Sequence, residues 1–261
     1  MSEAIRLPSF RLDNRVAMVT GSGTGIGAGI ASGFAEAGAD LVLVGRTLGP
    51  LQATARRVES FGRKATIIVC DLTDRTELRS QIASLSCLDI LINNAGTSIP
   101  EPILEVTDAS LDTMVNLNVT ALFVASQAAT RKMLDNPDRR QRGGAIVNIS
   151  SQMGHVGATN RTVYCMTKHA VEGLTKAMAI ELAPHRIRVN SVGPTLVDTP
   201  LARRVVDTPE KRAYFESRIP LGSLASVEDI VAAAVYLASP AAAMVTGAPY
   251  WSTVAGPRST C

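Results

Sequence analysis

Aromatic residues and cysteines are scarce in this sequence. Aromatic side chains make up 4% of the 261 residues, and the four cysteines are Cys70, Cys87, Cys165 and Cys261. They form no Cys-x-x-Cys pair, so the spacing argues against a zinc site and a disulfide framework and predicts reduced thiols. We expect no bound metal. The apolar content of 46% comes mainly from aliphatic side chains, which suits helices packed on a buried parallel sheet.

A membrane-length apolar run and a strong net charge are also missing. A long uncharged stretch, residues 230–249, is interrupted by Pro240, which favours a helix, a turn and a strand over a membrane span. Residues 1–14 lack the hydrophobic region of a signal peptide. The net charge is +3, and the basic cluster at residues 139–142 adjoins two glycines, as in a solvated loop. We expect a cytoplasmic protein with a small-molecule substrate and no membrane or nucleic-acid partner.

Short apolar runs alternate with helix-length segments along the whole chain. Uninterrupted apolar runs are typical of parallel strands that are covered by helices on both faces. We therefore predict an α/β fold, a Rossmann-type doubly wound parallel sheet of about seven strands, in a single domain over residues 1–261 with an N-terminal extension at 1–14. The expected strands are residues 16–20, 41–44, 65–70, 88–92, 145–149, 187–192 and, from a weaker pattern, 250–254.

A glycine-rich segment lies between the first predicted strand and a helix expected at about residues 26–37. Its glycines, Gly21, Gly25 and Gly27, have the spacing G-x-x-x-G-x-G, with Ser22 and Ile26 between them. Glycines let a backbone turn tightly and approach a pyrophosphate, and a helix N-terminus offers unpaired N–H groups. The alternative is tight helix–strand packing without a ligand. The position after the first strand favours dinucleotide binding.

The end of the second predicted strand bears on the choice of cofactor. An acidic residue there binds the ribose 2′-hydroxyl of NAD, whereas an arginine accommodates the 2′-phosphate of NADP. The sequence has Arg46 and Thr47 at this point and no carboxylate. Arg46 can pair with a phosphate and Thr47 can add a hydrogen bond. NADP(H) is therefore favoured over NAD(H), although a surface arginine that only stacks on adenine or solubilises the loop is the alternative.

Tyr164 and Lys168 are four residues apart in a helical segment that runs to about Pro184. Residues at this spacing share one face of a helix. A phenol ionises near pH 10, and a neighbouring ammonium favours the phenolate, so Lys168 is expected to lower the pKa of Tyr164 into the range of an acid/base catalyst. A buried tyrosine beside a surface lysine is the alternative, because the pair alone is common.

Several motifs occur together and in one order, and with them the sequence resembles the short-chain dehydrogenase/reductase family from Arg15 to about Gly256. Within the family the similarity is greatest to the branch that contains L-xylulose reductase and tetrameric carbonyl reductases. The matching motifs are Thr20-Gly-x-x-x-Gly-Ile-Gly27, Asn93-Asn94-Ala95-Gly96, Asn118, Ser151, Tyr164-x-x-x-Lys168 and Asn190-x-x-x-Pro194.

The resemblance implies a role for each matching residue. Tyr164 would be the proton donor or acceptor, Ser151 would hydrogen-bond the substrate oxygen, and Lys168 would lower the tyrosine pKa and bind the nicotinamide ribose. Asn118 would hold a water that links Lys168 to solvent. Gln152 could reach a substrate hydroxyl, with an ordinary loop residue as the alternative. The cofactor contacts implied in addition to the glycine turn, Arg46 and Thr47 are Asp71, Leu72, Asn94, Ala95, Gly96, Tyr164, Lys168, Pro194, Val197 and Thr199.

The expected reaction is hydride transfer between NADP(H) and a ketone, dicarbonyl or ketose, or the corresponding secondary alcohol or polyol. A 3-oxoacyl thioester reductase is the alternative enzyme, because it would use the same catalytic residues. A non-catalytic dinucleotide-sensing protein is the alternative from another class, but it has no need of Ser151, Tyr164 and Lys168 together. Residues from about 195 to 220 are expected to form a polar lid over the substrate.

The resemblance also implies a homotetramer. The expected subunit contacts are helices at about residues 111–134 and 163–183, whose small side chains allow close approach of a second helix. One helix needs only one stripe of apolar residues to cover its own sheet, so apolar residues around the remaining surface suggest a second buried face. A dimer is the alternative, because residues 254–257 depart from the usual C-terminal pattern of the family.

Overall fold

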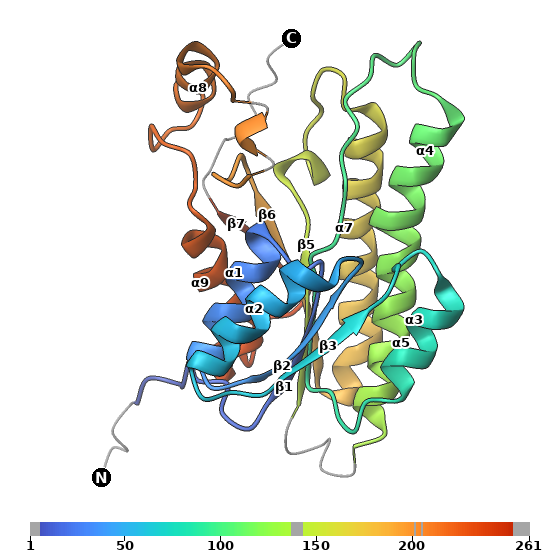
Figure 1. Ribbon diagram of the computed structural model, residues 1–261, viewed down its shortest axis with the longest axis vertical. Helices are drawn as coiled ribbons and strands as arrows, with labels where there is room; N and C mark the ends of the chain where they lie inside the picture. The colour runs from blue at the N-terminus through green and yellow to red at the C-terminus, as the bar shows by residue number, and fades with distance from the viewer. Residues whose placement is uncertain (1–5, 137–142, 201, 205, 253–261) are drawn as a thin grey trace.

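The computed structural model describes residues 6–136, 143–200, 202–204 and 206–252 and contains one seven-stranded parallel sheet (Figure 1). The strand order β3-β2-β1-β4-β5-β6-β7 confirms the predicted doubly wound α/β fold. The order reverses between β1 and β4, and the crevice at such a switch point is the usual ligand site of these sheets. The strands are β1 (Val16–Thr20), β2 (Asp40–Gly45), β3 (Ala65–Val69), β4 (Ile90–Asn93), β5 (Gly144–Ile149), β6 (Ile187–Pro194) and β7 (Pro249–Ser252).

Helices cover both faces of the sheet, as Figure 1 shows. Helices α1 (Gly25–Glu36), α2 (Leu48–Ser60) and α9 (Val227–Ala238) pack on one face. The opposite face is covered by α3 (Arg75–Ala83), α5 (Leu122–Leu134) and α7 (Thr162–Leu182), with α4 (Asp108–Val115) leading into α5. Because successive strand residues face opposite sides, Ala17 and Val19 join the first apolar cluster while Met18 joins the second. Both faces are buried, which explains the uninterrupted apolar runs.

The predicted strands agree with the observed ones to within two residues, wherever the structure describes them. β4 begins at Ile90 rather than at residue 88, and the carboxylate of Asp89 instead accepts a hydrogen bond from the backbone N–H of Val16 (3.0 Å). β6 continues to Pro194, beyond the expected end at residue 192. For β7, residues 253 and 254 of the prediction lie outside the described residues, as do the altered residues 254–257.

The predicted helix over residues 111–134 differs most from the structure. It is divided into α4, a π-helical turn η1 (Asn116–Ala121) and α5. No glycine or proline announces this interruption in the sequence. Single π turns inside α-helices are uncommon and are often found at functional sites. Here the turn contains Asn118, a buried residue whose side chain bonds to two other elements.

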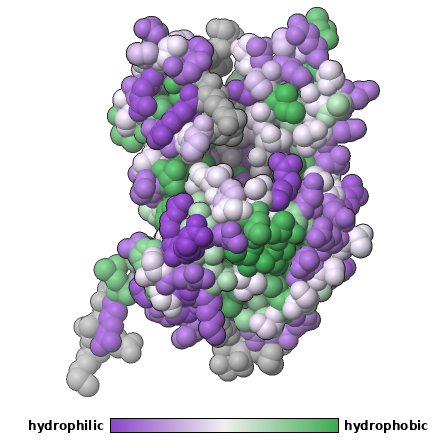
Figure 2. Space-filling model, viewed as in Figure 1, coloured by the Kyte–Doolittle hydropathy of each residue, from purple (hydrophilic) through white to green (hydrophobic). Residues whose placement is uncertain are grey.

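The segment over residues 195–220 stands apart from the sheet. It contains a short helix η4 (Ala202–Arg204) and α8 (Pro209–Glu216), which has no buried residue and lies at the upper left in Figure 1. Charged side chains on the surface of this segment form ion pairs, such as Lys211–Asp207 (2.7 Å) and Arg203–Asp198 (2.8 Å). Figure 2 shows mostly hydrophilic side chains on the lobe with α8, at the upper left. The lid remains a prediction that fits this placement.

Three short turns complete the described elements. They are η2 (Gln152–Gly154), η3 (Ala183–His185) and η5 (Pro240–Ala242). The uncharged stretch at residues 230–249 forms most of α9, then η5 and the start of β7, as the sequence predicts. Across the part of the chain that the structure describes, no helix is both long enough and apolar enough to cross a membrane.

Candidate active site

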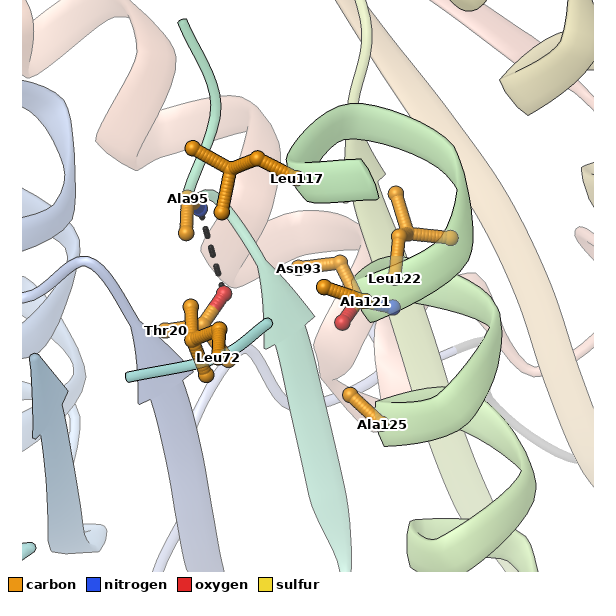
Figure 3. Close-up of a pocket in the computed structure, with 8 residues that line it drawn as sticks. All are labelled: Thr20, Leu72, Asn93, Ala95, Leu117, Ala121, Leu122 and Ala125. Atoms are coloured by element: carbon orange, nitrogen blue, oxygen red, sulfur yellow. Dashed lines mark hydrogen bonds between the residues drawn. The ribbon is translucent and has the colours of Figure 1, made fainter. Parts of the chain in front are cut away.

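The side chain of Thr20 joins the two loops at the switch point. Its hydroxyl accepts hydrogen bonds from the backbone N–H groups of Asn94 (3.0 Å) and Ala95 (3.1 Å), the second of which is drawn in Figure 3. The amide of Asn94 donates in return to the carbonyls of Thr20 (3.0 Å) and Gly21 (3.2 Å). The turn after β1 and the turn after β4 are therefore fixed against each other.

The glycine turn has the backbone geometry that the sequence predicts. Gly25 has φ of 56°, in the left-handed region that favours glycine. A Cβ at Gly27 would collide with the carbonyl oxygen of Gly21 and the amide nitrogen of Asn94. Thr24, the N-cap of α1, makes no side-chain capping bond, and the first turn of α1 has no acidic residue. The positive end of this helix is thus open to an anion.

Ser22 differs from the other residues of this turn. Its side chain is buried, and both its N–H (3.2 Å) and its hydroxyl (3.4 Å) donate to the carbonyl of Val44. The carbonyl of Ser22 accepts a hydrogen bond from Thr54 (2.9 Å). Ser22 therefore ties the turn to β2 and α2, and its hydroxyl faces the protein interior instead of a ligand. Ile26 is partly buried and packs against the first apolar cluster.

Arg46, Thr47 and Asp71 lie together at the carboxyl ends of β2 and β3. Thr47 is the N-cap of α2, and its hydroxyl makes no capping bond. The pKa of Asp71 is lowered, mainly by hydrogen bonds from the N–H (2.9 Å) and hydroxyl (2.8 Å) of Thr73 and also by the positive charge of Arg46. The exposed Arg46 is thus near Asp71 and lies at the edge of the crevice.

An apolar hollow lies beside this edge (Figure 3). Leu72 and Ala95, both expected to contact the cofactor, are among the residues that line it. The hollow has space for no more than about one water molecule, and none of its lining side chains is an acid/base group, so it does not perform proton transfer. Its lining residues are Thr20, Leu72, Asn93, Ala95, Leu117, Ala121, Leu122 and Ala125.

The structure brings Ser151, Tyr164 and Lys168 together where β5 ends against the start of α7. The hydroxyl of Ser151 neighbours that of Tyr164 and acts to lower the pKa of the phenol. Ser151 also accepts a hydrogen bond from the backbone N–H of Met153 (3.1 Å), which fixes its side chain at the start of η2. The ammonium of Lys168 donates to the carbonyl of Ile149 (2.8 Å) and lies 5.7 Å from the centre of the Tyr164 ring.

The electrostatics of this group differ in one respect from the sequence-based expectation. Burial raises the pKa of Tyr164, while the neighbouring hydroxyl of Ser151 and the charge of Arg161 act in the lowering direction. Burial outweighs both, so the expected net lowering is not found. Burial also lowers the pKa of Lys168 to about 8, against the opposing effect of Glu172. At neutral pH the tyrosine holds its proton and the lysine is still mostly charged.

Asn118 braces the site from the π turn. Its side-chain oxygen accepts from the N–H of Thr97 (2.8 Å), and its amide donates to the carbonyl of Thr97 (2.8 Å) and the hydroxyl of Thr167 (3.2 Å). The side chain therefore links the loop after β4 to α7. A Cβ at Gly96 would lie 3.2 Å from the Asn118 oxygen, so the backbone approaches closely here. The water relay expected of Asn118 stays a prediction.

The remaining predicted residues lie around the same crevice. Pro194 ends β6 and is buried, and Val197 pairs with Ala225 in an isolated bridge. The side chain of Thr199 lies next to Gly25, so this segment returns over the glycine turn. Gln152 follows Ser151 in η2 and is partly buried.

Comparisons with known proteins identify the family. The family model described as enoyl-(acyl carrier protein) reductase matches residues 21–251. L-xylulose reductase from Mus musculus is 40% identical over 236 residues, which cover 90% of this chain and 93% of that protein. The chain belongs to the short-chain dehydrogenase/reductase family. As a member it is an oxidoreductase that acts on alcohol or carbonyl groups.

Solved structures show the same relationship. A short-chain type dehydrogenase/reductase from Mycobacterium marinum is 36% identical with a TM-score of 0.86, covering 93% of this chain and 95% of that one. A gluconate 5-dehydrogenase from Burkholderia cenocepacia, in complex with NADP and tartrate, is 33% identical with a TM-score of 0.87, covering 94% and 96%. The agreement extends over almost the whole length of the chain.

Four residues of the site were not anticipated from the sequence. Thr20 is predicted only as the first residue of a motif, and the sequence predicts no role for Thr97, Thr167 or Glu172. For Thr20 the usable signal is a hydroxyl at the last position of the strand before a glycine turn. For Glu172 it is the repetition of the four-residue spacing, since it lies one helical turn beyond Lys168.

The buried Lys168 makes stability depend on pH. Its pKa is about 8 in the folded protein against an ordinary 10.5, so between these values the unfolded chain binds more protons and stability rises with pH. Relative to Lys168→Met, the wild-type free energy of unfolding should increase by about 2 kcal/mol between about pH 7 and about pH 9.5. Urea denaturation of both proteins measures this difference. A difference that does not change with pH would contradict the burial of a charged Lys168.

Proposed function

We propose that this chain is an NADP(H)-dependent enzyme that interconverts a ketone, dicarbonyl or ketose with its secondary alcohol or polyol, with Tyr164 as general acid/base. The observation that carries the proposal is the grouping of Ser151 and Tyr164, with the ammonium of Lys168 5.7 Å from the centre of the tyrosine ring. This group lies at the same sheet edge as the glycine turn. The proton-transfer group and the turn that would bind the dinucleotide can therefore act on the same substrate.

The residues present fit a dinucleotide. Gly21 and Gly25 have positive φ, which lets the turn bend closely around a phosphate, and the first turn of α1 has no side-chain cap to compete with it. The nicotinamide, when bound, supplies or accepts the hydride. Tyr164 and Ser151 can then both donate hydrogen bonds to the substrate oxygen, and this stabilises the negative charge that develops on it. Tyr164 gives up its proton as that oxygen becomes a hydroxyl.

The raised pKa of Tyr164 favours the direction of carbonyl reduction at neutral pH, because the hydroxyl holds the proton it must donate. Lys168 keeps a positive charge near the ring and is positioned by the carbonyl of Ile149. Asn118 fixes the loop after β4 against α7. A 3-oxoacyl thioester reductase remains the second candidate, because the matching family model is described by an acyl-carrier substrate.

Two further proposals concern cell location and substrate contact. The structure leaves Cys70, Cys87 and Cys165 as free thiols, which supports a reducing compartment such as the cytoplasm. Gln152 adjoins Ser151 in η2, which supports a hydrogen bond to a second oxygen of the substrate. The small-molecule substrate would enter between this turn and the segment with α8.

The first test removes one oxygen atom. Tyr164→Phe keeps the ring that packs beside Lys168 but removes the hydroxyl that transfers the proton. Turnover should fall by at least about 100-fold, the usual contribution of an acid/base group, while the dissociation constant for NADPH stays nearly the same. Steady-state kinetics and a cofactor titration measure the two quantities. Retention of more than about a tenth of wild-type turnover would rule out this role for Tyr164.

The second test concerns the cofactor. Arg46 is exposed at the end of β2, with the uncapped hydroxyl of Thr47 beside it, which supports pairing with a 2′-phosphate. The wild type should prefer NADPH to NADH in kcat/KM, and Arg46→Asp should reverse the preference, with a loss for NADPH of about tenfold or more. Arg56→Asp in α2, also exposed, is the matched charge control. A wild-type preference for NADH would refute the assignment.

The third proposal is a homotetramer, with a dimer as the alternative. Apolar side chains stand exposed on the outer surfaces of α5 and α7, among them Phe123 (45%), Met166 (50%) and Ile180 (78%). Light scattering should give about four times the 27.5 kDa mass of one chain. Phe123→Glu should give smaller particles, whereas Phe61→Glu, at a similarly exposed phenylalanine (46%) after α2, should not. A monomeric wild type would disprove the assembly.

A further inference from the structure

A buried carboxylate lies one helical turn beyond Lys168. Glu172 is part of α7 and is only 4% exposed. A carboxylate that is removed from water is costly unless hydrogen bonds or opposite charges compensate it. The positions of Tyr164, Lys168 and Glu172, four residues apart, place all three on one face of α7. Proton transfer at Tyr164 does not require an acidic residue here, so the burial of Glu172 calls for another explanation.

Glu172 is held by groups from two other elements. The hydroxyl of Ser191 in β6 donates to one carboxylate oxygen (2.8 Å). The other oxygen lies 3.4 Å from Nε2 of His155, which follows η2 directly. Gly154 permits this approach, because a Cβ there would lie 2.9 Å from Cγ of Glu172 and 3.0 Å from the hydroxyl of Ser150. The carboxylate thus joins α7, β6 and the turn that begins at Ser151.

The same carboxylate acts on the charge of Lys168. Burial lowers the pKa of the ammonium, and the negative charge of Glu172 is the opposing influence. The groups that face this region are Lys168 and Tyr164 from α7, His155 after η2, and the hydroxyls of Ser150 and Ser191. Among these groups, only the charged Lys168 lies between Glu172 and Tyr164 along α7.

We propose that Glu172 is a positioning residue, which keeps Lys168 charged at neutral pH and anchors the turn that carries Ser151. The proposal depends on the proposed function only for its effect on turnover, since the charge of Lys168 can be observed without a substrate. A neutral Lys168 would no longer favour the phenolate of Tyr164 during the reaction. A looser turn would misplace Ser151, whose side chain is fixed by Met153 in that turn.

The test replaces the charge and keeps the shape. Glu172→Gln retains an acceptor for Ser191 but removes the negative charge. The matched control is Glu181→Gln, an exposed glutamate near the end of the same helix. Because the chain has five lysines, ¹³Cε-lysine NMR can follow the titration of Lys168, with Lys168→Met assigning its signal. The pH profile of kcat/KM for carbonyl reduction by the intact enzyme is the second readout.

In Glu172→Gln, the NMR midpoint of Lys168 should fall by about one pH unit, the size expected for loss of a nearby opposite charge. The basic limb of the kcat/KM profile should move by the same amount, and Glu172→Asp should recover part of the shift. Glu181→Gln should leave both unchanged. If Glu172→Gln does not fold, Ser191→Ala, which removes the hydroxyl that orients the carboxylate, should give a smaller shift in the same direction.

The outcomes separate this inference from the proposed function. An unchanged Lys168 midpoint in Glu172→Gln, or in Ser191→Ala if the first variant does not fold, would overturn the role of Glu172 whatever the turnover. A lowered midpoint in a protein that reduces no carbonyl would support the role of Glu172 and refute the proposed function. A loss of turnover with no movement of either midpoint would show that Glu172 is merely structural.

Discussion

The parallel arrangement of the seven strands sets where every functional group of this protein can lie. All strands end at the same edge of the sheet, and the order of the strands reverses between β1 and β4. Backbone pairing there forces the turn after β1 and the turn after β4 into contact, and the hydroxyl of Thr20 bonds them. Three parts of the site lie at this edge. They are the glycine turn after β1, Arg46 after β2, and Ser151 and Tyr164 where β5 ends against the start of α7.

A second constraint is electrostatic. The site keeps the ammonium of Lys168 and the carboxylate of Glu172 buried on one helix, beside the phenol of Tyr164, and burial disfavours the charged forms of Lys168 and Tyr164. The cost to stability is reduced by a few fixed bonds, from Lys168 to Ile149 and from Ser191 to Glu172. The same residues on the protein surface would cost less stability. Tyr164 and Lys168 would then be solvated, and their electrostatic interaction would be weak. The burial is therefore part of how the site works.

Much of the fold could be predicted because the relevant signals are local. Each buried strand is an apolar run, and the pairing of Tyr164 with Lys168 follows from the period of the helix. The sequence did not reveal the π turn at Asn118, because no glycine or proline marks it and the bonds of Asn118 are to Thr97 and Thr167, which are distant in sequence. It also suggested the wrong environment for Ser22, whose hydroxyl bonds to Val44. The pKa direction of Tyr164 was missed because burial, which has no local signature, outweighs its neighbours.

The central claim is that this site transfers a hydride between NADPH and a small carbonyl compound. The most direct measurement is the absorbance at 340 nm of NADPH mixed with the protein and a panel of ketoses, dicarbonyls, simple ketones and 3-oxoacyl thioesters. A fall in absorbance with a ketose, dicarbonyl or ketone, and little with the thioesters, is the predicted result. Turnover confined to thioesters would contradict the substrate class. Cofactor binding without any turnover would contradict catalysis itself.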